Sequence, residues 1–116
     1  MSLGNIVAML AALVVLAPVA EEAIFRAGLH EQLLRWGLVP GHANALTVLA
    51  FVLVHGLSRS WALGLAVALP AWWIGRVYGA QRRLRPCIAW HAGFNLVWMA
   101  LASAAPGSFD LPTTAG

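Results

Sequence analysis

The stretch Glu21-Glu22-Ala-Ile-Phe-Arg26 follows directly on an apolar run, Leu3 to Ala20, whose length is close to that of a membrane-spanning helix. Ionised groups at the edge of hydrocarbon are costly, and they persist there mainly when they pair, face a cavity or take part in chemistry. Glu22 precedes Arg26 by four residues, the favourable helical order for an ion pair. Glu21 is then the carboxylate without a local partner.

The composition of the whole chain indicates a membrane protein. Of its 116 residues, 61% are hydrophobic and 9% are charged, whereas about a quarter of the residues of a soluble domain are charged. The net charge of +3 comes from arginines near predicted helix ends, which indicates membrane topology and lipid headgroups rather than nucleic acid. Cys87 is the only cysteine, so an intrachain disulfide is excluded and a buried, inert thiol is expected.

We expect an all-α polytopic membrane protein, with residues 1–116 as one domain and about four transmembrane helices. The N-terminal apolar run is expected to be retained as the first of these helices. It lacks the basic start of a signal peptide, and two glutamates would follow the cleavage point. Pro18 has no N–H for the carbonyl of Val14, which predicts a kink just before the glutamates.

An amphipathic segment from Ile24 to Trp36 is expected to continue at the membrane surface, with Trp36 as an interfacial anchor. Glu31 and Arg35 make a second pair four residues apart. His30 is expected to be solvated in this segment. Its apolar residues share one helical face: Phe25, Leu29, Leu33 and Trp36.

Three further helices are expected over Ala43–Leu57, Trp61–Gly79 and Pro86–Ala105, separated by Gly, Pro and polar residues. A frayed tail is expected over residues 106–116. The helix from Trp61 is expected to kink at Pro70 and to pack closely through its glycines, Gly64, Gly75 and Gly79.

The arginines also predict the orientation of the helices in the membrane. Those around the last loop place it in the cytoplasm, with both termini outside: Arg76, Arg82, Arg83 and Arg85.

Two further islands of polarity lie in apolar surroundings, Phe51-Val-Leu-Val-His55 and His91-Ala-Gly-Phe-Asn95. Taken alone, His55 is explained as an interfacial histidine, and His91 with Asn95 as a polar contact between helices. Taken together with Glu21, they supply what peptide hydrolysis needs. Glu21 and His55 suit the activation of water, and His91 and Asn95 suit the stabilisation of an oxyanion.

In order and approximate spacing, Glu21-Glu22-x-x-x-Arg26, Phe51-x-x-x-His55 and His91-x-x-x-Asn95 resemble the three signatures of the CPBP family of intramembrane proteases. This family comprises CAAX prenyl endopeptidases and bacteriocin-processing (Abi) enzymes, and the resemblance covers residues 18–98. It implies an endopeptidase in which Glu21 and His55 activate water without a metal or other cofactor. It also implies that His91 and Asn95 stabilise the oxyanion, while Glu22, Arg26 and Phe51 assist or are structural.

The resemblance carries expectations about location, substrate and partners. It implies a protein of the bacterial inner membrane that acts on a membrane-anchored protein or peptide. A C-terminal sorting tail is one such substrate, as in the JDVT-type sorting system. Family members usually have additional membrane helices before the glutamate motif. The chain is therefore expected to be a minimal form, a fragment, or one that needs a homo-oligomer or partner subunit to complete its cavity.

Three alternatives to a metal-free protease stay open. Glu21, His55 and His91 match a known catalytic zinc set of two histidines, one glutamate and an open position. A membrane scaffold or bacteriocin-immunity protein would keep the fold without turnover. A proton relay or transporter subunit, the weakest of the three, would need a continuous polar path.

The depth of the motifs poses a geometric condition. Counting along the helices places His55 near the outer end of the second helix and His91 near the inner start of the fourth. The helix Ala43–Leu57 would be about 22 Å long, shorter than a hydrocarbon core of about 30 Å. The motifs therefore meet only if this helix is sunk below the outer membrane surface or extends beyond Leu57, so that His55 lies at mid-depth.

Overall fold

The structure is a computed structural model that describes residues 2–104. Every regular element among these residues is a helix, as the all-α prediction requires. The tail predicted over residues 106–116, and the predicted end of the last helix at Ala105, lie outside the described residues.

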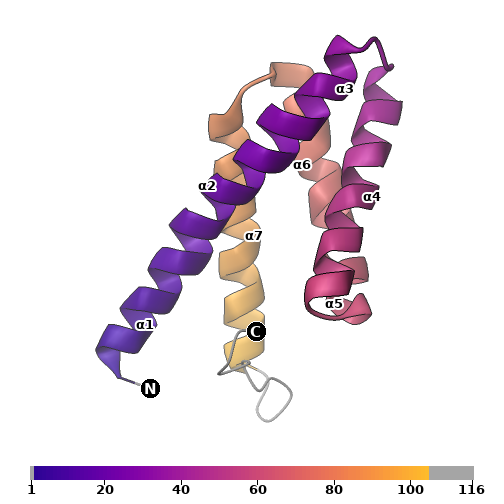
Figure 1. Ribbon diagram of the computed structural model, residues 1–116. Coiled ribbons are helices and arrows are strands. Elements are labelled where there is room, and N and C mark those ends of the chain that lie inside the picture. Colours follow the sequence, from indigo (N-terminus) through magenta and orange to yellow (C-terminus); the bar gives the residue numbers. More distant parts are fainter. Residues whose placement is uncertain (1, 105–116) are drawn as a thin grey trace.

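The chain begins with one long helical stretch of 33 residues among those described, Leu3–Arg35. It passes through α1 (Leu3–Leu10), η1 (Ala11–Leu16), α2 (Ala17–Glu22), η2 (Ala23–His30) and α3 (Glu31–Arg35), with η1 and η2 wound as π-helices. In Figure 1 this stretch crosses α7 obliquely. The amphipathic segment is thus a direct continuation of the first membrane helix.

The inner face of this long helix differs from the predicted one at His30. His30, expected to be solvated, is fully buried, and so is Arg26. Phe25 and Leu33 are buried as expected, but Trp36 is 70% exposed. The buried stripe therefore includes polar residues spaced by four, because the other helices supply partners that the local sequence does not show.

The remaining helices are α4 (Pro40–Ser58), α5 (Trp61–Ala66), α6 (Ala68–Gln81) and α7 (Leu84–Ala104). The third predicted helix is broken at Val67 into α5 and α6. Pro70 explains the break, since it cannot donate to the carbonyl of Ala66. Three helices among the described residues are long and apolar enough to cross a membrane, Leu3–Arg35, Pro40–Ser58 and Leu84–Ala104. The chain is an integral, polytopic membrane protein.

Two small buried clusters connect these helices. One contains Ile74, Val77, Tyr78 and Cys87, and the other contains Phe25, Phe51 and Ala71. Cys87 is completely buried, as predicted. The first cluster joins α6 to α7, and the second joins η2 and α4 to α6 and contains Phe51 of the second motif.

Glycines set the distance between α4 and its neighbours. A Cβ on Gly64 would lie 2.9 Å from the backbone oxygen of Val52, and one on Gly75 would overlap the side chain of Asn44. Close packing at these two glycines is confirmed. At Gly79 the prediction is wrong, because a Cβ there would meet nothing within 4 Å.

A polar clamp joins the end of the long helix to the end of α6. Glu31 accepts hydrogen bonds from the Tyr78 hydroxyl at 2.6 Å and from Arg82 Nε at 2.7 Å. Arg35 Nε lies 3.2 Å from the same carboxylate, as the four-residue spacing predicted. Arg82 ends α6 in the left-handed conformation, with φ of 53°. This end of the molecule also holds the turn into α4 (Figure 1).

Candidate active site

The predicted ion pair of the first motif is present in the interior. Arg26 Nε lies 3.4 Å from Glu22 Oε1, and both side chains are completely buried. Arg26 Nη2 also donates to the carbonyl of Ala71 at 2.6 Å, and the guanidinium carbon lies 5.7 Å from the centroid of the Phe51 ring. A buried charge is tolerable when it is paired and hydrogen-bonded. Arg26 therefore compensates Glu22 and ties the long helix to α6.

The second motif meets the other glutamate. His55 Nε2 lies 3.1 Å from Glu21 Oε1, and 18% of the His55 side chain and 27% of the Glu21 side chain are exposed. His55 Nδ1 lies 2.8 Å from the carbonyl oxygen of Phe51. Because a carbonyl oxygen only accepts, Nδ1 carries a hydrogen and Nε2 is the nitrogen presented to Glu21.

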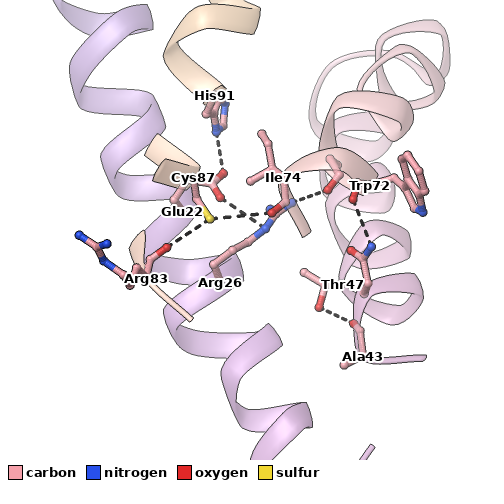
Figure 2. A network of polar contacts seen from close by, with 11 residues as sticks. Glu22, Arg26, Ala43, Thr47, Trp72, Ile74, Arg83, Cys87 and His91 are labelled. Carbon is pink, nitrogen blue, oxygen red and sulfur yellow. Dashed lines mark hydrogen bonds and ion pairs between the residues drawn. The ribbon is translucent and has the colours of Figure 1, made fainter. Parts of the chain in front are cut away.

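The third motif is bound to the long helix at two points. His91 Nδ1 lies 2.7 Å from Glu22 Oε2, a contact drawn in Figure 2. One turn later, Asn95 Nδ2 donates to the carbonyl of Leu13 at 2.6 Å. His91 is buried, and Asn95 is partly buried. The residues predicted to stabilise an oxyanion thus come from α7 but are held by the first helix.

Phe51 lies between the three motifs. Its ring centroid is 4.2 Å from that of His55, 6.1 Å from that of His91 and 4.8 Å from that of Phe25. From the sequence motif, a structural or assisting role was expected for Phe51. The structure places it as the apolar wall that both histidines share.

The first two motifs meet because each lies a similar number of residues from the turn that joins the two helices. Glu21 lies 14 residues before the end of the long helix at Arg35, and His55 lies 15 residues after the start of α4 at Pro40. The two helices run in opposite directions from one short turn, so both residues lie at similar distances from that end. The helix predicted over Ala43–Leu57 runs from Pro40 to Ser58, and the first two motifs do meet, at the contact of Glu21 with His55.

Two polar groups near this site were not predicted as part of it. His30 continues the four-residue stripe of Glu22 and Arg26, and neither of its ring nitrogens has a hydrogen-bond partner among the described residues. Its ring lies 5.0 Å from that of Tyr78. Asn44 donates to the carbonyl of Trp72 at 3.1 Å. The four-residue spacing is a signal that identifies His30, whereas nothing local identifies Asn44.

The histidines and glutamates of the three motifs form two separate pairs. Each histidine is paired with a different glutamate, His55 with Glu21 and His91 with Glu22. Residues 2–104 contain no group of three or more His, Cys, Asp or Glu side chains placed to hold a metal. The zinc set proposed from Glu21, His55 and His91 does not converge on one point here.

A membrane bundle with two carboxylate–histidine pairs and a partly accessible glutamate defines a membrane-embedded polar site of the kind that hydrolases use. The sequence model of the type II CAAX prenyl endopeptidase Rce1-like family matches residues 3–97, which include all three motifs. The chain therefore belongs to this family, and at the level of the family it is a protease. No curated protein and no solved structure matches it.

Proposed function

We propose that this protein is an intramembrane endopeptidase that uses water activated by Glu21 to cut a membrane-associated protein or peptide. Membership of the CAAX prenyl endopeptidase family supports peptide hydrolysis. The observation that supports Glu21 as the base is its contact with His55, at 3.1 Å in a partly exposed position. A C-terminal tail in a bacterial inner membrane is the substrate and location that we propose.

The two neighbouring glutamates have different surroundings, which supports different roles. Glu22 is completely buried, and its oxygens face Arg26 and His91. Glu21 is 27% exposed, and only Oε1 faces His55. A general base must reach the proton that it removes, directly or through one water. Glu21 meets this requirement, whereas Glu22 serves to hold Arg26 and His91.

The proton positions follow from the contacts of His55. Its Nδ1–H donates to the Phe51 carbonyl, so a carboxylate at Nε2 pairs best with a ring that carries a second proton. In the proposed reaction the water oxygen bonds to the scissile carbonyl carbon while Glu21 takes one of its protons. The C–N bond then breaks as the leaving nitrogen receives a proton from the pair of Glu21 and His55.

The oxyanion would be stabilised from α7. Asn95 has two N–H groups on its amide, and one of them is used by Leu13. His91 has Nδ1 turned to Glu22, which leaves Nε2 for the substrate. In a ring that carries both protons, Nε2–H is a second donor. We propose that these two groups bind the oxyanion as it forms.

Replacement of Glu21 by glutamine tests this proposal. The purified protein in lipid vesicles is given two peptides of one sequence ending in a CAAX box, farnesylated and unprenylated, and products are identified by mass. Removal of a general base costs roughly 10²–10⁴-fold, so we expect Glu21→Gln to lose at least about 100-fold while its melting temperature stays close to wild type. Gln81→Ala, at an exposed position outside the site, is the control.

Three outcomes of this assay would contradict the proposal. Full activity of Glu21→Gln would remove Glu21 as the base. Loss of activity with a chelator, together with about one bound zinc per chain, would favour the metal-dependent alternative. Absence of cleavage of either peptide, and of any C-terminal tail anchored in the same vesicles, would favour the non-catalytic scaffold.

A further inference from the structure

The carbonyl group of Leu13 has lost its helical donor. In η1 the N–H of Ala17 donates to the carbonyl of Ala12, five residues back, in the π-helical pattern. The next donor in this pattern would be residue 18, which would serve Leu13. Residue 18 is proline and has no N–H. In an α-helix the missing N–H of Pro18 would affect the carbonyl of Val14. In this π-helical turn it leaves the carbonyl of Leu13 without a backbone donor.

Asn95, on α7, supplies the hydrogen-bond donor that the helix lacks at this position. Its Nδ2 donates to the Leu13 carbonyl at 2.6 Å, across 82 residues of sequence. An unpaired backbone carbonyl away from water costs about as much as a lost hydrogen bond, so the contact stabilises both partners. The side chain of Pro18 is fully buried in the same region. The amide of Asn95 is thus held in one orientation by an acceptor that exists because residue 18 is proline.

We propose that Pro18 is a positioning residue, which orients Asn95 through the carbonyl of Leu13. The inference rests on the proposed function, in which the second N–H of the Asn95 amide binds the oxyanion. One N–H is fixed by Leu13, so the other has a set direction before substrate arrives. Such preorganised donors are the effective ones, and small misplacements lower rates.

The orientation of Asn95 can be measured without any substrate. The chain has three asparagines, Asn5, Asn44 and Asn95, so protein labelled with ¹⁵N-asparagine gives three side-chain NH₂ signals. Asn95→Ala assigns one of them. Pro18→Ala restores an N–H that competes for the Leu13 carbonyl, so we expect the Asn95 signals to shift and those of Asn44 to stay. Pro40→Ala is the matched control, because Pro40 begins α4, where no N–H is needed.

A kinetic cycle with the same variants tests the consequence for catalysis. Loss of a whole oxyanion donor costs roughly 10²–10³-fold in kcat, so a misdirected one should cost about 10-fold. We expect this loss in kcat for Pro18→Ala, with KM within about twofold. In the Asn95→Ala background, Pro18→Ala should cause no further loss, since the two residues act through one contact.

The two measurements separate this inference from the proposed function. Unchanged Asn95 signals in Pro18→Ala would overturn the positioning role, whatever the activity. So would losses that multiply in the double variant. If Pro18→Ala does not fold, amide exchange in the wild type decides: one Asn95 Nδ2 proton should exchange at least about 10-fold slower than the other. Equal exchange would overturn the inference. Shifted Asn95 signals in a protein that cuts no peptide would leave the contact established and the protease proposal wrong.

Discussion

Arg26 is the residue that makes adjacent carboxylates tolerable inside this bundle. It contacts Glu22, the Ala71 carbonyl and the face of Phe51, and it is completely buried. Two carboxylates side by side in a low-dielectric interior repel each other unless a cation compensates one of them. With Glu22 compensated by Arg26, Glu21 is free to pair with His55. The compensation of Glu22 by Arg26 therefore leaves Glu21 available for its contact with His55.

Substitution of Arg26 tests this balance through stability. Arg26→Met leaves Glu22 as a buried carboxylate without its cation, and breaking a buried pair in this way costs about 3–5 kcal/mol. Glu22→Gln combined with Arg26→Met removes both charges, so this double variant should recover at least half of the loss. Unfolding in detergent, followed by circular dichroism against denaturant, measures both. Equal loss in the single and double variants would show that packing, not charge, makes Arg26 necessary.

The contacts of these residues show where local sequence stops being informative. The pairs Glu22–Arg26 and Glu31–Arg35 follow from four-residue spacing, and both are present. The partner of His91 is Glu22, 69 residues away, although the sequence indicated only that the motifs converge. Which glutamate each histidine contacts depends on how two helices are rotated, and a single sequence holds no measure of that rotation.

At the scale of elements, the corner between α4 and α5 is fixed by small residues. A Cβ on Gly64 would lie 2.9 Å from the Val52 oxygen and 3.0 Å from the backbone of Gly56. Backbone atoms cannot move aside as a flexible side chain does, so only glycine permits this approach. His55 lies next to Gly56 in the last turn of α4, so the corner also holds the second motif in place.

Gly64→Ala should therefore open this corner and destabilise the protein. Overpacking of a close contact costs about 1–3 kcal/mol, and the displaced α4 should weaken the contact between Glu21 and His55. The matched control is Gly79→Ala on α6, where the added methyl meets nothing and alanine favours a helix by about 1 kcal/mol over glycine. Thermal unfolding in detergent should fall for the first variant and stay level or rise for the second. Similar changes in both variants would argue against the close-packing explanation.

The elements also show which breaks a sequence predicts well. Prolines indicated disturbances near residues 14–18 and at Pro70, and the structure has the π-helix η1 and the break at Val67 at these places. The type of disturbance was not predictable, because a missing N–H can be accommodated by a kink, a π-turn or a new helix start. At η1 the accommodation is a π-helix whose Leu13 carbonyl accepts a hydrogen bond from Asn95 of α7.

At the scale of the molecule, the site forms because two helices fold back from one end and carry Glu21 and His55 at similar spacings from the turn. Glu21 and His55 lie at similar distances from the turn at Trp36–Val39, and the clamp of Glu31 with Arg82 joins α6 to the same end. Composition and hydropathy were sufficient to predict an all-helical membrane protein. They were not sufficient to predict the depth of the motifs, since that depends on the helix bounds, and α4 begins at Pro40 rather than at the predicted Ala43.

Orientation in the membrane can be tested on the whole molecule with single cysteines. Gln81 ends α6 and Ser58 ends α4, both are exposed, and the native Cys87 is completely buried and should give little background. The positive-inside rule places the end with Arg82 and Arg83 in the cytoplasm. In right-side-out vesicles, an impermeant maleimide should label Ser58→Cys and spare Gln81→Cys, and inside-out vesicles should reverse the result. A reversed pattern would invert the orientation. Labelling of both positions from one side would contradict the crossing of the membrane between them, and with it the depth at which the candidate site lies.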